Sequence, residues 1–139
     1  MARTTFTGPV VSKNGFVDGH ATTAAINATA TATAAQVATG YITSTSAAAT
    51  TITLPTGTLL GTALGATQGT VLDLYVDNTA GASTVTIAVA TNGVLSTGAV
   101  DAAAAGTFGD LTIASGATGL ARFTIMFSSA TAYAFTRTA

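Results

Sequence analysis

The segment Leu120–Ser128, LARFTIMFS, has the clearest strand pattern in the chain and decides the fold class. Apolar and mostly polar side chains alternate along it: Ala121, Phe123, Ile125 and Phe127 against Arg122, Thr124, Met126 and Ser128. Because successive side chains of a strand point to opposite faces, this alternation predicts a strand with one buried face and one outer face. The segment 132–138, AYAFTRT, alternates in the same way and predicts a second strand.

The aromatic residues of these two segments have two possible uses. They could pack in a hydrophobic core or form a platform for a sugar ring. Their regular alternation inside strands favours the core. We therefore expect buried side chains at Phe123, Phe127, Tyr133 and Phe135.

Further strand patterns occur upstream, and turn signals separate them. The predicted strands are Thr50–Pro55 (TTITLP), Thr70–Val76 (TVLDLYV), Thr84–Ala90 (TVTIAVA) and Asp110–Ala114 (DLTIA). The turn TNG, followed by VLSTGAV, predicts that the third of these continues into a hairpin meander. About six to eight short strands without a long helix predict an all-β fold, either an antiparallel β-sandwich or a small jelly-roll-like barrel.

A glycine-rich segment, GTLLGTALGATQG, interrupts the predicted strands. Its glycines are spaced four residues apart, at Gly57, Gly61, Gly65 and Gly69. On a helix they would form one smooth stripe of small residues. In a threonine-rich chain we expect a loop instead, or one short helical turn that carries Leu59, Leu60 and Leu64.

The first 49 residues have a different character from the rest. Residues 1–20 predict an extended arm, because Pro9 favours extended backbone and both Asn14-Gly15 and Asp18-Gly19 are turn pairs. Residues 21–49 are rich in alanine and threonine, and the alternation ATATATA favours an extended or weakly ordered segment. The expected organisation is thus an arm (1–20), an Ala/Thr-rich extended segment (21–49) and a β domain (50–139).

The composition restricts the possible partners. Charged residues make up 6% of the 139 residues, the net charge is -1, and there is no cysteine. The few basic residues form no cluster that would bind nucleic acid or a membrane surface, and no apolar run reaches the roughly 20 residues of a membrane-spanning helix. The absence of cysteine excludes disulfides and thiolate metal sites. A surface with so little charge favours association with other chains.

Few residues could carry catalysis or hold a metal ion. His20 is the only histidine, so neither a catalytic triad nor a histidine metal cluster can form, and we expect a solvent-exposed turn residue. Asp73 and Asp77 should share one strand face, where paired carboxylates could act in acid–base chemistry or bind calcium weakly. However, Asp77 with Asn78 is typical of a turn, and Asp73 is expected to face solvent. We predict no enzymatic activity, no cofactor and no metal.

Two aromatic residues, Phe6 and Phe16, lie in the predicted arm, where no local core would bury them. Exposed aromatic residues in an extended segment commonly anchor it on a partner. The arm also carries two of the four basic residues of the chain. We expect contacts with another protein chain at Arg3, Phe6, Pro9, Lys13, Asn14 and Phe16.

The segment 2–16, ARTTFTGPVVSKNGF, resembles the start of a group of small tailed-phage structural proteins. These proteins begin with a string close to Arg-Thr-Thr-Phe-x-Gly-Pro-Val-x-Ser-x-Asn-Gly-Phe and continue through a threonine-rich region into an all-β domain. The likeness is looser over residues 50–90. Many members of the group look like capsid decoration, or cement, proteins.

The resemblance implies a structural role rather than an active site. Such a protein would bind the outer surface of an assembled phage head, contact the major capsid protein and stabilise the capsid lattice. It would commonly act as a homotrimer where capsid subunits meet. Its location would be the capsid surface of the virion, after synthesis in the host bacterial cytoplasm.

Two other classes of function remain open from the sequence. Arrays such as TATAT, TIT and TVT could match an ice lattice or a carbohydrate, although they recur at no constant period. A subunit of a tail or fibre is the other alternative.

Overall fold

The computed structural model describes residues 20, 22–95 and 111–139. The helices are α1 (Ala34–Ala38) and α2 (Gly57–Leu64), with a 3₁₀ turn at Gly116–Thr118. The strands are β1 (Ala24–Ala25), β2 (Ala30–Thr31), β3 (Tyr41–Thr43), β4 (Thr50–Thr53), β5 (Val71–Asp77), β6 (Val85–Ala88), β7 (Gly93–Leu95), β8 (Thr112–Ile113), β9 (Leu120–Ser129) and β10 (Ala132–Arg137).

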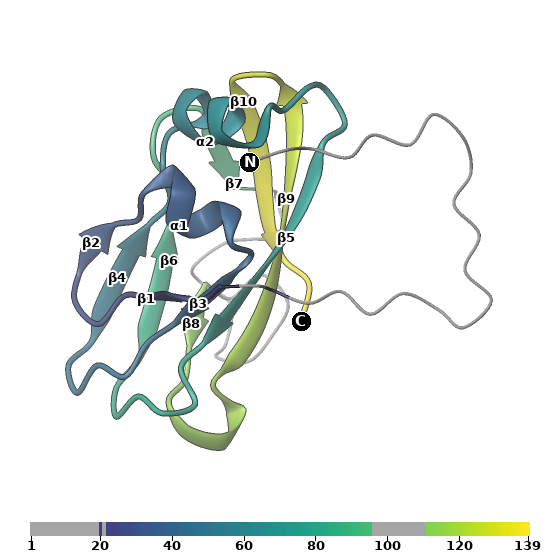
Figure 1. The fold of residues 1–139 in the computed structure, drawn as a ribbon. Helices are drawn as coiled ribbons and strands as arrows, with labels where there is room; N and C mark the ends of the chain where they lie inside the picture. Colours follow the sequence, from purple (N-terminus) through teal and green to yellow (C-terminus); the bar gives the residue numbers. More distant parts are fainter. Residues whose placement is uncertain (1–19, 21, 96–110) are drawn as a thin grey trace.

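The strands form a six-stranded sheet, in the order β1-β3-β5-β9-β10-β7, and a four-stranded sheet, in the order β2-β4-β6-β8 (Figure 1). The prediction of a mainly-β fold is confirmed. The expectation of antiparallel sheets is wrong, because both sheets are mixed. From β1 to β8 the chain alternates between the two sheets, so most neighbouring strands in this part of the chain are two apart in sequence. The pairs β1–β3, β3–β5, β2–β4 and β4–β6 are parallel, whereas β6–β8 is antiparallel.

The hairpin predicted around the TNG turn does not form. The turn itself is present, since Asn92 has a left-handed φ of 63°. However, β6 belongs to the four-stranded sheet, whereas β7 pairs in parallel with β10 in the six-stranded sheet. The turn carries the chain from one sheet to the other. The sequence therefore predicts the turn correctly, but contacts with the distant strand β10 decide where β7 pairs.

The two antiparallel strands β9 and β10 carry the centre of the hydrophobic core. The rings of Phe123 and Phe135 stack with centroids 5.0 Å apart, and the ring centroids of Phe127 and Tyr133 are 5.7 Å apart. All four side chains are buried, as their alternation predicted. Side chains from both sheets join the same hydrophobic cluster, those of the four-stranded sheet including Ile52, Val85, Ile87 and Ile113.

The glycine-rich segment, predicted as a loop or one short helical turn, begins with an eight-residue helix, α2, which carries Leu59, Leu60 and Leu64. The Thr56 hydroxyl oxygen accepts a bond from the Leu59 N–H and caps the helix start, and Gly65 ends the helix with a left-handed φ of 58°. A Cβ atom at Gly57 or Gly61 would overlap the backbone of the β9–β10 turn. The spacing of four residues thus creates a smooth helix face that lets α2 pack directly on this turn.

The Ala/Thr-rich part of the chain belongs to the same body. It supplies β1, β2 and β3 and, unexpectedly for an extended segment, the short helix α1. A capping box explains the helix start: the Thr33 hydroxyl accepts from the Gln36 N–H, and the Gln36 side chain accepts from the Thr33 N–H. Val37 on this helix and Ile42 on β3 are fully buried.

Replacement of Gly61 by alanine tests the packing of α2. We expect Gly61→Ala to lower the free energy of unfolding by roughly 1–3 kcal/mol, because the added methyl group would overlap the Ala130 carbonyl. The matched control is Thr62→Ala on the exposed side of the same helix, which should change stability by less than about 0.5 kcal/mol. Urea unfolding monitored by circular dichroism measures both. Equal stability of the two variants would contradict the close contact.

The buried hydroxyl of Tyr133 makes stability depend on alkaline pH. It donates a hydrogen bond of 2.9 Å to the Pro55 carbonyl, and burial raises the pKa of Tyr133 to about 12 from 10.0. The folded state therefore favours the neutral phenol, and its stabilising contribution is complete below pH 10 and is lost between pH 10 and 12.

Tyr133→Phe should lower the free energy of unfolding at neutral pH by about 1 kcal/mol, because it leaves the Pro55 carbonyl unpaired. The variant should also lose less stability than the unchanged protein when the pH rises above 10. Urea unfolding at a series of pH values measures both effects. A parallel decline of the two proteins over this range would contradict the assignment.

Candidate functional site

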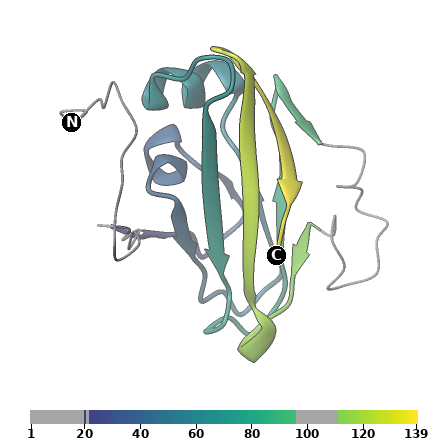
Figure 2. The ribbon, with the colours of Figure 1, turned by 90° about the vertical axis from the view of Figure 1, so that its right-hand side faces the viewer.

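The outer face of the six-stranded sheet is open, and no described element covers it along β5, β9 and β10 (Figure 2). Three of the four large hydrophobic side chains that the described residues expose lie on this face: Val71 (51% exposed), Leu120 (52%) and Met126 (51%). Val71 and Met126 are direct partners in the β5–β9 register. The fourth, Leu59, lies on α2. Leu120 lies at the other end of the paired strands, opposite Asp77, and polar or charged side chains occupy most of the outward positions between the two ends. The outward-facing side chains of β5 and β9 are here called the β5–β9 strip.

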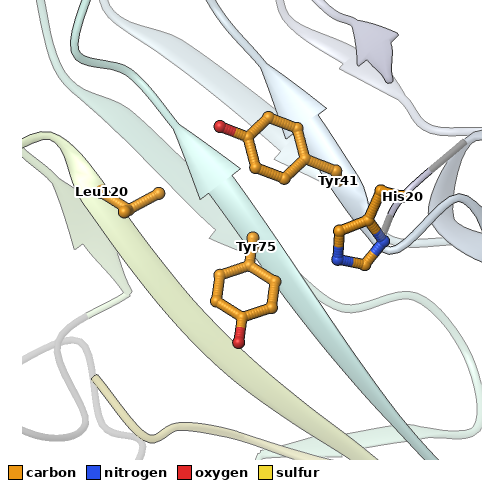
Figure 3. Close-up of a pocket in the computed structure, with 4 residues that line it drawn as sticks. All are labelled: His20, Tyr41, Tyr75 and Leu120. Atoms are coloured by element: carbon orange, nitrogen blue, oxygen red, sulfur yellow. The ribbon is translucent and has the colours of Figure 1, made fainter. Parts of the chain in front are cut away.

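A pocket of about 280 Å³ adjoins this strip and is lined by His20, Tyr41, Tyr75 and Leu120 (Figure 3). Tyr41 on β3 and Tyr75 on β5 are register partners, so their rings lie side by side, with centroids 6.5 Å apart and planes at 27°. The His20 ring lies 5.8 Å from the Tyr41 ring and 5.7 Å from the Tyr75 ring. Three rings thus converge on one surface hollow, here called the aromatic pocket.

Hydrogen bonds fix the orientation of His20. Its Nδ1 lies 2.8 Å from the Thr39 carbonyl oxygen. Because a carbonyl only accepts, Nδ1 must carry a proton, and in the neutral ring Nε2 then has a free lone pair. The sequence predicted a solvent-exposed turn histidine, but the side chain is half-buried and packed between two tyrosines.

Gly40 makes the position of His20 possible. Its φ of 73° favours glycine, and a Cβ atom there would come within 2.6 Å of the His20 ring. A left-handed glycine therefore leaves the space into which a histidine twenty residues earlier fits. No sequence pattern predicts the contact between His20 and Gly40, because it depends on how β3 pairs with β5 in the sheet.

Asp77 lies on the same face of β5 as Tyr75, and hydrogen bonds fix its carboxylate beside the pocket residue Tyr41. The hydroxyl and backbone N–H of Thr79 donate to Oδ1 at 2.6 and 2.9 Å, and the Tyr41 hydroxyl donates to Oδ2 at 2.8 Å. The Thr79 bonds, helped by the Tyr41 bond, lower the pKa of Asp77. The hydrogen bond to Asp77, together with burial and the charge of the carboxylate, raises the pKa of Tyr41. The carboxylate thus stays charged and the phenol neutral at ordinary pH.

The predicted pair of carboxylates does not act as a unit. Asp73 and Asp77 both lie on the outer face of β5, as expected from their spacing, with Tyr75 between them. Asp73 accepts a hydrogen bond of 2.9 Å from the Thr124 hydroxyl, whereas Asp77 is held by Thr79 and Tyr41. The turn predicted at Asp77-Asn78 is present, and its first residue caps the turn through the Thr79 N–H.

A second hollow, of about 390 Å³, lies between the starts of the two helices. Its lining includes Thr33, Pro55, Thr56 and Leu59 and contains no ionisable side chain. Within the described residues there is no group of three or more histidine, cysteine or acidic side chains that could hold a metal ion. No helix in the described part of the chain has the length and hydropathy needed to span a bilayer.

The residues predicted to contact a partner, Arg3, Phe6, Pro9, Lys13, Asn14 and Phe16, lie outside the described residues. The sequence analysis did not predict the aromatic pocket. A possible signal was that Tyr41 and Tyr75 both occupy outward-facing positions of strands. No family model, curated protein or solved structure matches this chain. The likeness of residues 2–16 to phage decoration proteins therefore remains a hypothesis.

Proposed function

We propose that this chain is a structural virion protein that binds the outer surface of a phage head. It contacts the major capsid protein and stabilises the capsid lattice, and it does so as a homotrimer.

One observation carries the proposal: the β5–β9 strip and the aromatic pocket lie together on the open face of the six-stranded sheet. Large apolar side chains that are exposed beside an aromatic hollow, on an uncovered sheet face, favour the docking of another molecule. Tyrosine and methionine, which interfaces favour, are both present there.

His20 connects the open face to the N-terminal segment that carries the resemblance, residues 2–16. His20 lies in the aromatic pocket, so the 19 residues before it join the body at the same open face. A chain of this length can span at most about 65 Å when fully extended. We propose that the arm and the open face bind the head together, since two linked contacts reinforce each other through effective concentration.

The architecture suits repeated display on a shell. Two sheets around one shared hydrophobic cluster support the finer interpretation of the fold as a β-sandwich. Such a body is rigid and can present one open face at each equivalent position of a lattice. Symmetry then multiplies a weak contact.

Removal of the arm tests the proposal. A variant that begins at Val17 should keep the unfolding midpoint of the full chain, but its binding to phage heads should weaken by more than about ten-fold, because two aromatic anchors are lost. Co-sedimentation with purified heads measures the binding. Leu59→Ser, which changes an exposed apolar side chain on α2, is the matched control and should bind as the full chain does. Equal binding by the shortened variant would contradict the anchoring role.

A further inference from the structure

The aromatic pocket has a polarity that its hydrogen bonds define. The Tyr41 hydroxyl uses its proton to donate to Asp77, so its oxygen presents lone pairs. The neutral His20 ring uses Nδ1–H for the Thr39 carbonyl, so Nε2 also presents a lone pair. The hydrogen-bonding groups whose orientation is fixed around the hollow are therefore acceptors, so a ligand that fits must carry hydrogen-bond donors.

The charges beside the pocket favour a positive ligand. Asp73 and Asp77 flank Tyr75 on the same face of β5, and their hydrogen-bond donors among the described residues are the neutral groups of Thr124, Thr79 and Tyr41. Among the described residues, the basic side chain on this face is that of Arg122, the register partner of Tyr75, whose Nε donates to the Thr138 hydroxyl at 3.2 Å. The formal charge of these three described side chains sums to -1, which favours a cation.

The rings add a second attraction for a cation. The faces of aromatic rings are electron-rich, and a lysine or arginine group within about 6 Å of a ring centroid is attracted to them. Three ring centroids, each within 6.5 Å of the other two, surround the hollow. Leu120 supplies an apolar side along which the methylene groups of a basic side chain can lie.

We infer that the aromatic pocket binds a single lysine or arginine side chain presented by the capsid surface. The ammonium or guanidinium group would lie against the rings of His20, Tyr41 and Tyr75 and donate a hydrogen bond to Nε2, and the Asp77 carboxylate on the same sheet face would add a charge attraction. The chemistry follows from the pocket alone, whereas the capsid as the source of the side chain rests on the proposed function. A pocket of about 280 Å³ suits one side chain better than a folded segment.

The only histidine in the chain gives a direct reporter for this site. Its ring proton signal in an NMR spectrum of the full-length protein needs no further assignment. We expect a saturable shift on titration with Nα-acetyl-lysine-N-methylamide at neutral pH, with a dissociation constant in the millimolar range. The norleucine analogue, which has the same stem without the charge, should bind at least five-fold more weakly.

Two substitutions test which atoms matter. Tyr75→Leu should weaken binding of the lysine probe roughly two- to five-fold, the usual effect of one exposed cation–π contact, whereas Tyr75→Phe keeps the ring and should bind as the unchanged protein does. Unfolding midpoints of both variants show whether the fold is retained. An absent shift, or an equal response to the norleucine analogue, would overturn the inference. A larger response to methyl glucoside than to the lysine probe would also overturn it, in favour of a sugar site.

Co-sedimentation of the same variants with heads separates this inference from the proposed function. Tyr75→Leu should bind heads several-fold more weakly than Tyr75→Phe. If the lysine probe binds but the two variants bind heads equally, the capsid is not the source of the side chain and that part is overturned. If Tyr75→Leu instead dissociates the oligomer in sedimentation velocity, the side chain comes from a second copy, which also overturns the capsid as source. If the protein binds heads but its histidine signal does not shift with the lysine probe, the proposed function stands and the inference about the pocket is wrong.

Discussion

The stacking of Phe123 on Phe135, with Phe127 against Tyr133 beside it, is the contact on which the rest of the structure depends. It joins β9 to β10 on the inner side of the six-stranded sheet, and β9 in turn pairs with β5 along seven residues of each strand. The remaining members of the sheet are short: β1 contains two residues, and β3 and β7 contain three each. Short strands gain little from their own hydrogen bonds, so their order follows from packing against this aromatic layer.

A strand that buries large rings on one face leaves its other face available. The alternation that places Phe123, Ile125 and Phe127 inward also places Met126 outward, and on β5 it places Tyr75 and Val71 outward. The open face is therefore a consequence of the same period of two that builds the core. No described helix covers it, because both helices pack at other places (Figures 1 and 2).

The sequence could predict elements whose evidence is local. β4, β5, β6, β9 and β10 follow from alternation, and the burial of the aromatic residues follows with them. It could not predict partners, because the chain alternates between sheets and neighbouring strands are separated by one that belongs elsewhere. The full length of α2 was not predicted because glycine is a weak helix former. The contact with the β9–β10 turn, which leaves no space for a Cβ atom, explains why Gly57 and Gly61 are glycines. The aromatic pocket was missed because it needs a left-handed Gly40, a register between Tyr41 and Tyr75, and a histidine from a distant segment.

The central claim is that the open sheet face docks on the phage head, and hydroxyl-radical footprinting tests it most directly. Free and head-bound protein would be oxidised in parallel, and modification of each side chain would be measured by mass spectrometry. The account predicts that binding protects Leu120, Met126 and Tyr75, while Leu59 on α2, which is as exposed as any of them, is oxidised equally in both states. Protection of Leu59 without protection of Met126 would contradict the account.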